Sequence, residues 1–172
     1  MQPSQLDQIL HQQVAASSQI VDVDEPLLKL VVFRLHQQYF AVPGAQVKEI
    51  LPGLEQVFFL PGMPAEVEGV VNLRGAIESV LNFKQLLQLD SHTANPNLAA
   101  TSLLLAQGQD LRTCLRVDEL LDLIDLPTSQ LQEPPSTLPK HLQPLVTQVF
   151  NWQQLAVACL DLDAIFAVWQ QG

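Results

Sequence analysis

The chain has 172 residues, 18 of them acidic and 8 basic, and a net charge of −10 at pH 7. Nucleic acids and anionic membrane surfaces bind clusters of basic side chains, so this balance argues against both as partners. Hydrophobic residues make up 48% and aromatic residues 6% of the sequence, which predicts one domain, or two very small ones, with a core of Leu and Val.

The first 26 residues differ in composition from the rest. They are rich in Gln and Ser and end in the acidic segment VDVDEP, which predicts a flexible polar tail over 1–26, with a short helix at Leu6 to Val14. The tail lacks the basic and apolar regions of a signal peptide, and no apolar run approaches the roughly 18 residues of a membrane span. A cytoplasmic location is therefore expected.

Short strands and tight turns are predicted from residue 27 onward. Apolar, β-branched runs bounded by turn residues favour strands at 27–35, 39–42, 46–51, 55–60, 67–73 and 76–81. A hairpin turn joins the last two, and Gly75 supplies the positive φ that such a turn needs. Asn82 is a good N-cap for a short helix whose apolar side carries Phe83, Leu86 and Leu87. The polar segment 90–97 is expected to be a linker.

The second half is also predicted to consist of short strands followed by a helix. Strands are predicted at 102–107, 110–117, 145–152 and 155–160, separated by a proline-rich loop over 127–144. A final helix begins after Asp161 and has an apolar stripe of Leu162, Ile165, Phe166 and Trp169. The segment 117–126 is ambiguous, because its Asp residues have helical spacing although it lies among strands. Its acidic side chains are expected to be solvated.

An internal repeat links the two halves. Residues 70–87 align without a gap on residues 149–166, so that Asn72 meets Asn151 and Asn82 meets Asp161. A duplicated small β-barrel closed by a helix explains this match, and convergent amphipathic patterning is the alternative. Arg74 meets Gln153 at the turn, so this arginine is not part of the repeated framework.

The sequence offers no catalytic constellation. It contains neither an H-E-x-x-H nor a G-x-S-x-G motif, and its seven glycines form no phosphate-binding loop. The two cysteines, Cys114 and Cys159, lie in apolar segments and are expected to be small buried side chains. We therefore expect no enzymatic activity, no cofactor and no bound metal.

One motif resembles a known family. Residues 69–75, G-V-V-N-L-R-G, match in full a motif of the CheW family, the adaptor proteins of bacterial chemosensory arrays. Segments 47–51, 116–135 and 158–166 resemble other family motifs in the same order, so the likeness runs from about Leu27 to Trp169. The chain departs from the family at 78–82, where a Pro-Val-x-Asp strand is usual, and at 114–116, where a glycine commonly precedes the Val-Asp segment.

The resemblance implies an all-β fold of two intertwined five-stranded Src-homology-3-like β-barrels with short capping helices. It places a CheW-like domain at 27–172, for which we expect a first barrel mainly over 27–89 and a second mainly over 101–169. It also implies that segment 117–126 is an extended strand. The Gln-rich tail and the divergence resemble the adaptors of pilus-driven twitching or phototaxis systems.

The resemblance also implies a role in two-component signal transduction. Family members are non-enzymatic scaffolds that couple a methyl-accepting chemoreceptor to a CheA-type histidine kinase, and so control motility from receptor arrays at the membrane. The alternative from a different class is a stand-alone β-barrel that binds a small ligand or a response regulator. Co-purification with a histidine kinase would separate the two.

Site residues follow from the same likeness. In the family the N-L-R-G arginine lies by the groove between the barrels, where a receptor's helical tip docks. This implies receptor binding by Arg74 with its neighbours Leu73 and Gly75, and by Val47 and Glu49 of the matching first-half motif. A kinase-contact surface is implied at a barrel end, without named residues.

A plainer reading of Arg74 remains open. The arginine could serve only the hairpin turn, paired with Glu68 or with Glu78 across the hairpin. An exposed pair of this kind stabilises a protein by at most about 1 kcal/mol, which is a weak reason for an arginine at the turn.

Overall fold

The computed structural model describes residues 25–89 and 97–171. Most of the predicted tail and of the predicted linker therefore lies outside the described residues. The strands are β1 (Leu27–Leu35), β2 (Gln38–Pro43), β3 (Val47–Pro52), β4 (Val67–Leu73), β5 (Ala76–Asn82), β6 (Ser102–Gln107), β7 (Arg112–Val117), β8 (Glu119–Pro127), β9 (Val146–Trp152) and β10 (Leu155–Leu160). The helices are α2 (Phe83–Leu86) and α3 (Leu162–Gln171), with short 3-10 turns at Gly44–Gln46, Leu98–Ala100 and Thr128–Gln130.

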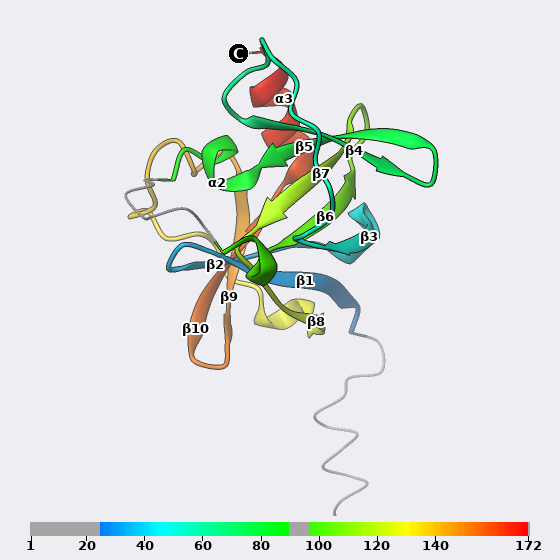
Figure 1. The fold of residues 1–172 in the computed structure, drawn as a ribbon. Coiled ribbons are helices and arrows are strands. Elements are labelled where there is room, and N and C mark those ends of the chain that lie inside the picture. The colour runs from blue at the N-terminus through cyan, green and yellow to red at the C-terminus, as the bar shows by residue number, and fades with distance from the viewer. Residues whose placement is uncertain (1–24, 90–96, 172) are drawn as a thin grey trace, which may run out of the picture.

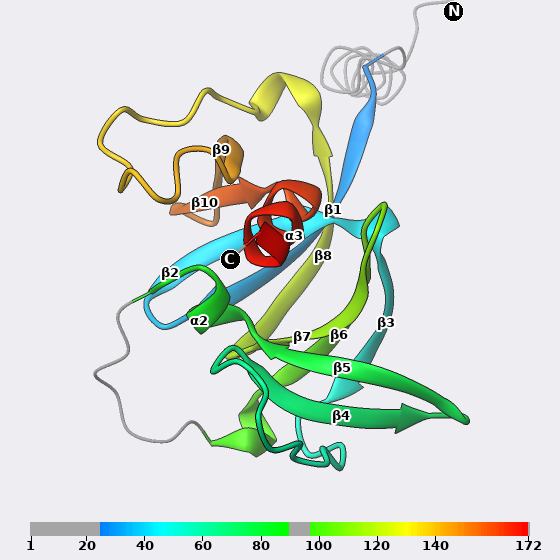
Figure 2. The same ribbon diagram turned by 90° about the horizontal axis from the view of Figure 1, so that it is seen from above.

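The strands form two curled sheets (Figures 1 and 2). Barrel I has the order β3-β6-β7-β5-β4, and barrel II has the order β8-β1-β2-β10-β9. Neighbouring strands are antiparallel except for two parallel pairs, β5 with β7 and β2 with β10. The prediction of two intertwined five-stranded barrels is confirmed.

Each barrel takes three strands from its expected half of the chain, β3, β4 and β5 for barrel I and β8, β9 and β10 for barrel II, and a hairpin from the other half. The hairpin β1–β2 belongs to barrel II although it begins the described chain, and β6–β7 belongs to barrel I although it lies in the second half. The two parallel pairs make this exchange, for example where Val157 of β10 lies beside Tyr39 of β2. Neither barrel is therefore confined to 27–89 or to 101–169.

The predicted repeat appears as a repeated structure. The series β3, β4, β5, α2 of barrel I recurs as β8, β9, β10, α3 of barrel II. Both hairpin turns use two residues with positive φ, Arg74 (52°) and Gly75 (88°) in one, Gln153 (50°) and Gln154 (67°) in the other. Both helices are capped as predicted, since a side-chain oxygen of Asn82 or of Asp161 accepts a backbone N–H of the first turn.

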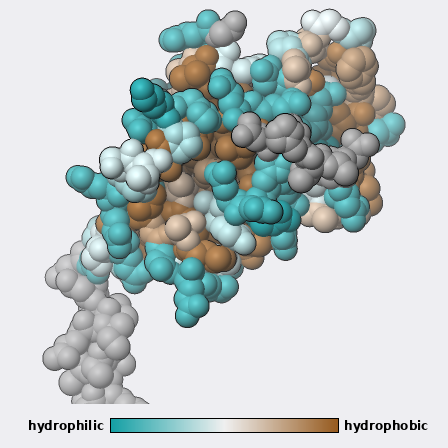
Figure 3. Space-filling view, turned by 90° about the vertical axis from the view of Figure 1, so that its left-hand side faces the viewer, coloured by the Kyte–Doolittle hydropathy of each residue, from teal (hydrophilic) through white to brown (hydrophobic). Residues whose placement is uncertain are grey.

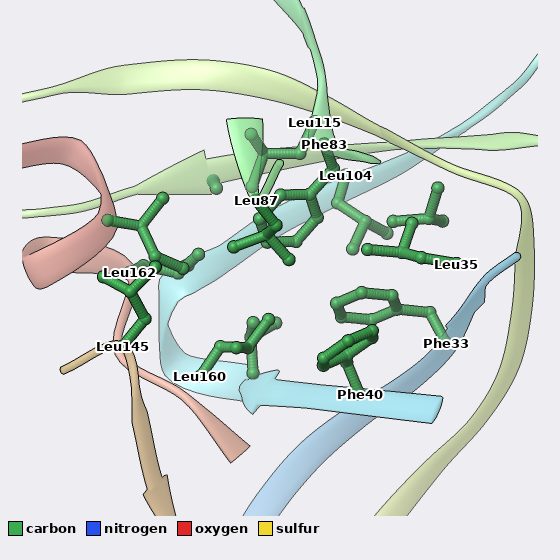
Figure 4. Packing of buried hydrophobic residues seen from close by; sticks show 14 of the residues in the cluster. Phe33, Leu35, Phe40, Phe83, Leu87, Leu104, Leu115, Leu145, Leu160 and Leu162 are labelled. Atoms are coloured by element: carbon green, nitrogen blue, oxygen red, sulfur yellow. The ribbon is translucent and has the colours of Figure 1, made fainter. Parts of the chain in front are cut away.

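The hydrophobic core has three parts. The largest lies between the barrels, where the Phe33 ring contacts those of Phe40 and Phe83 (Figure 4). The α3 side chains Leu162, Ile165 and Phe166 belong to the same cluster. A smaller cluster fills each barrel, and each contains one of the two free cysteines. Because the central cluster takes side chains from both barrels, the barrels are packed as one unit.

Two local expectations differ from the structure, and one ambiguity is resolved. Residues 55–60 form no strand. Only Phe58 pairs there, through two backbone hydrogen bonds to Val70, and the neighbouring Phe59 and Leu60 are exposed. Residues 119–127 form the strand β8, which pairs with β1. Segment 117–126 is therefore extended and not helical, although its Asp residues have helical spacing. Asp118 is not simply solvated, because it forms an ion pair of 2.9 Å with Lys84.

Candidate functional site

A groove lies between the two barrels. It is bordered by β3 of barrel I and by β1 and β8 of barrel II, and its volume is about 460 Å³. Within the described part of the chain, β3 and β8 are the sheet edges without a covering partner, whereas β4 is covered by Phe58 and β9 by Gln132. The groove therefore offers both apolar side chains and unpaired strand edges to a ligand.

The walls of the groove are mainly apolar, with charged residues along the rim. Val47, Leu30 and Val31 lie inside, and Ile50 and Leu123 stand at the border, where Leu123 is 62% exposed. The charged residues of the lining are Lys29, Lys48, Glu49 and Asp125. Of the predicted site residues, Val47 and Glu49 thus line the groove directly.

Arg74 reaches the groove through Glu49. Its guanidinium forms an ion pair and hydrogen bond with the Glu49 carboxylate. Glu49 is on β3 and Arg74 follows β4, and these are the two edge strands of barrel I, so the pair joins the two edges of the curled sheet. The Glu49 side chain is 28% exposed and that of Arg74 is 79% exposed, which leaves most of the guanidinium open to a partner.

The turn itself holds Arg74 in place. Arg74 and Gly75 both have positive φ, and the Gly75 N–H donates a hydrogen bond of 2.9 Å to Asn72 Oδ1. A Cβ at Gly75 would meet no atom within 4 Å, so glycine is needed there for its backbone conformation and not for space. Leu73 is half-buried against the barrel I cluster and anchors the end of β4.

The proposed turn partners of Arg74 are both engaged elsewhere. Glu68 forms an ion pair of 2.8 Å with Arg116, and Glu78 forms one of 2.9 Å with Arg112. Neither of the two ion pairs expected for a purely structural Arg74, with Glu68 or with Glu78, is therefore present. The ion pair that does exist is exposed on the arginine side and contributes about 1 kcal/mol or less.

The basic residues of the chain are distributed unevenly. All eight lie in the described residues, and five of them, Arg34, Arg74, Lys84, Arg112 and Arg116, form ion pairs. The other three of the eight are Lys29, Lys48 and Lys140, and they form no ion pair with another described residue. Two of these three line the groove, beside the acidic Glu49 and Asp125, so the lining carries charges of both signs and includes two lysines that form no ion pair with a described residue. Sequence reasoning missed Lys29 and Lys48, although lysines within two apolar strands were a visible signal.

A second exposed surface lies on the connection from β3 to β4. We call residues 54–63 the apolar loop, because it exposes the large apolar side chains of Leu54, Phe58, Phe59, Leu60 and Met63. Phe59 is 75% exposed. Figure 3, a view of one side of the molecule, shows how apolar patches reach the surface between hydrophilic side chains. Sequence reasoning assigned residues 55–60 of this loop to a strand and did not single out their exposure.

The apolar loop is held firmly on the barrel. A Cβ at Gly69 would lie 2.2 Å from the Phe58 carbonyl oxygen, so only glycine lets the loop pair with β4 at this point. At the other end of the loop, the buried Arg116 donates hydrogen bonds to Gly53 O (3.1 Å) and to Thr101 Oγ1 (2.8 Å). Exposed apolar side chains on a fixed frame are typical of a protein interaction surface.

The described residues offer little for other chemistry. They contain no group of three or more His, Cys, Asp or Glu side chains that could hold a metal ion. Burial raises the pKa of the Cys114 and Cys159 thiols to about 11, so both stay protonated and unreactive at neutral pH. In the same part of the chain, no helix is long and apolar enough to cross a membrane.

Comparison with known proteins identifies the family. The model of the CheW-like domain matches residues 29–169. The chain belongs to the CheW-like family. Curated relatives include the chemotaxis protein CheW of Bacillus subtilis, 23% identical over 80% of this chain and 85% of the relative, and that of Rhizobium meliloti, 27% identical over 80% and 86%. Protein PilI of Pseudomonas aeruginosa is 28% identical over 71% of this chain and 66% of its own length.

A solved structure agrees with the fold. The crystal structure of the scaffolding protein TtCheW from Thermoanaerobacter tengcongensis superimposes with a TM-score of 0.69 and 19% identity, covering 81% of this chain and 92% of that chain. The predicted CheW-like fold is thereby confirmed. The match to PilI supports a likeness to the PilI-like branch of the family.

Proposed function

We propose that this CheW-like protein is a non-enzymatic adaptor that couples a chemoreceptor to a CheA-type histidine kinase. The observation that carries the proposal is the inter-barrel groove with the Glu49–Arg74 pair at its rim, in a chain whose relatives are named chemotaxis proteins. An adaptor needs two separate protein-binding surfaces and no reactive centre. The groove and the apolar loop are two such surfaces.

The groove is the receptor site in this proposal. A receptor tip is helical, and an amphipathic helix binds by laying its apolar face into a hydrophobic groove. Val47, Ile50 and Leu123 would contact that face, while Lys29 and Lys48 favour a helix with acidic residues beside its apolar stripe. Arg74 would add a charge-assisted hydrogen bond at the rim, as arginine does at many interfaces.

The apolar loop is the kinase site in this proposal. It lies on barrel I, and its exposed Phe58, Phe59 and Leu60 can be buried by an apolar surface of the kinase regulatory domain. A shallow hollow beside the Arg74 turn is lined by Glu55 and Phe58 of the loop, so the two surfaces adjoin at Arg74. Contacts at this border would let a receptor influence the kinase.

Location and pathway follow from the same role. We infer that the protein works in the cytoplasm and is recruited to receptor arrays at the membrane through its groove. The match to PilI favours pilus-driven motility over flagellar motility, and phototaxis is one behaviour that such a system can control.

The test is assembly of a ternary complex. The chain is mixed with a receptor-tip fragment and a CheA-type kinase from the same organism, and complexes are separated by size-exclusion chromatography. Leu123→Ser should release only the receptor, and Phe59→Ser only the kinase. Val168→Ser is the matched control, because Val168 is similarly exposed, at 56%, and lies on α3, which contributes no residue to the groove or to the apolar loop. Failure of the wild-type chain to join receptor and kinase would overturn the proposal.

A further inference from the structure

We propose that the chain's own residues 4–14, which precede the described part, occupy the inter-barrel groove as an amphipathic helix when no receptor is bound. The groove is open and apolar, and two of the protein's three cations without an ion pair among the described residues line it. The occupant is named from the sequence of this segment, from its charge and from the point where it joins the barrels. That the segment competes with a receptor rests on the proposed function of the groove.

The sequence of residues 4–14 suits a helix in a groove. Ser4 followed by Asp7 has the spacing of a capping box, with Ser4 as N-cap. Leu6, Ile9 and Leu10 then stand at i, i+3 and i+4, which places them on one face of a helix. A helix this short is marginal in water and gains its stability by packing that face against an apolar surface.

The attachment point lies close to the groove. The Glu25 carboxylate accepts a hydrogen bond of 2.7 Å from the Ser129 N–H, and Pro26 O accepts one of 3.2 Å from the Thr128 N–H, so the chain is fixed there beside the end of β8. Lys29 lines the groove four residues further on, which is about 13 Å along a strand.

The connecting residues have the right length. Residues 15–24 form a ten-residue connection, whose root-mean-square span as a flexible chain is about 16–19 Å. This span exceeds the roughly 13 Å of strand between the attachment point and Lys29, so the segment can reach the groove, and a short flexible tether gives an effective concentration on the order of millimolar. Even weak intrinsic binding would therefore keep the groove occupied for much of the time.

Charge also favours this occupant. Residues 1–24 carry three acidic side chains, Asp7, Asp22 and Asp24, and no Lys or Arg. Lys29 and Lys48 of the groove have no acidic partner among the described residues, although the chain has a net charge of −10. Asp7 can therefore form an ion pair with Lys29 or Lys48, and the segment has no Lys or Arg that would repel these two lysines.

Occupancy is tested with a nitroxide on the tail of the full chain. Gln12→Cys is labelled selectively, because Cys114 and Cys159 are both buried. NMR amide signals of 48–50 and 123–125 should be broadened strongly, and those of the distant turn 153–154 should not. The matched control carries the same label with Leu6, Ile9 and Leu10 all changed to Ser, which keeps the tether and removes the apolar face. Loss of the groove broadening in this control supports the proposal.

A second readout separates this proposal from the receptor function. If the groove also binds receptors, the triple Ser variant should bind a receptor-tip peptide about threefold to tenfold more tightly than the wild-type chain. Unchanged affinity together with tail-dependent broadening would mean that the tail occupies the groove and the receptor binds elsewhere. Equal broadening with and without the apolar face overturns the proposal. So does broadening that grows with protein concentration, because a second copy is then the occupant.

Discussion

Gly69→Ala should destabilise the protein and displace the apolar loop. A Cβ at this position would lie 2.2 Å from the Phe58 carbonyl oxygen and 2.8 Å from its carbonyl carbon, and the φ of Gly69 is +152°. The contact is with backbone, so Phe58 must move away and lose its two hydrogen bonds to Val70. Those bonds contribute about 1 kcal/mol each, and the unfavourable backbone conformation adds about 1–3 kcal/mol. The expected loss in free energy of unfolding is therefore about 3–5 kcal/mol.

Gly62→Ala is the matched control for this prediction. Gly62 also has a positive φ, +82°, but a Cβ there would meet nothing within 4 Å. Its substitution should cost only about 1–2 kcal/mol, the ordinary penalty for an L-residue in this conformation. Urea unfolding of both variants measures the difference, and kinase binding by Gly69→Ala should weaken more than receptor binding. Equal losses for the two variants would refute the close approach of Phe58 to β4.

Three further predictions concern the rest of the fold. Phe166→Ala should lower the free energy of unfolding by about 3–5 kcal/mol in urea titrations, since this side chain is 3% exposed in the core between the barrels. Burial raises the pKa of Asp118, but hydrogen bonds from Lys84 and from a backbone N–H outweigh burial and lower it below 3.8. The stability lost in Asp118→Asn should thus be largest above pH 3.8 and shrink as the pH falls below it, as measured by thermal unfolding from pH 7 to pH 2. Ellman's reagent should react with Cys114 and Cys159 only after unfolding, because burial raises the pKa of both thiols to about 11.

Local features of this protein could be predicted because they depend on neighbouring residues. The run 27–35 is a strand by its β-branched content, and the turn at Gly75 needs a residue that accepts positive φ. Asn82 caps α2 through its own side chain. The repeat of 70–87 in 149–166 could be recognised for the same reason, since both copies need the same turn and cap.

Long-range features could not be predicted in this way. The exchange of hairpins between the barrels depends on the parallel pairs β5–β7 and β2–β10, and periodicity within a strand does not reveal which strand lies beside it. The same limit explains the partner of Arg74, because Glu49 comes near it only when barrel I curls and brings β3 toward β4. Residues 55–60 were predicted as a strand because the exposed apolar side chains of a loop can form the same sequence pattern as a strand of the core.

The role of Arg74 is tested most directly by paired titrations. Wild type, Arg74→Ala and Gln153→Ala are each titrated with the receptor-tip fragment and with the kinase, after circular dichroism has shown that all three are folded. Gln153 is the control, because it occupies the equivalent turn of barrel II with a similar φ. Arg74→Ala should weaken receptor binding about 10-fold to 150-fold, which corresponds to a loss of about 1.5–3 kcal/mol for an interface arginine, and should weaken kinase binding far less, because Arg74 only borders the apolar loop. Gln153→Ala should change neither affinity. If both affinities of Arg74→Ala fall together, or if neither falls, Arg74 is a structural turn residue and does not dock the receptor.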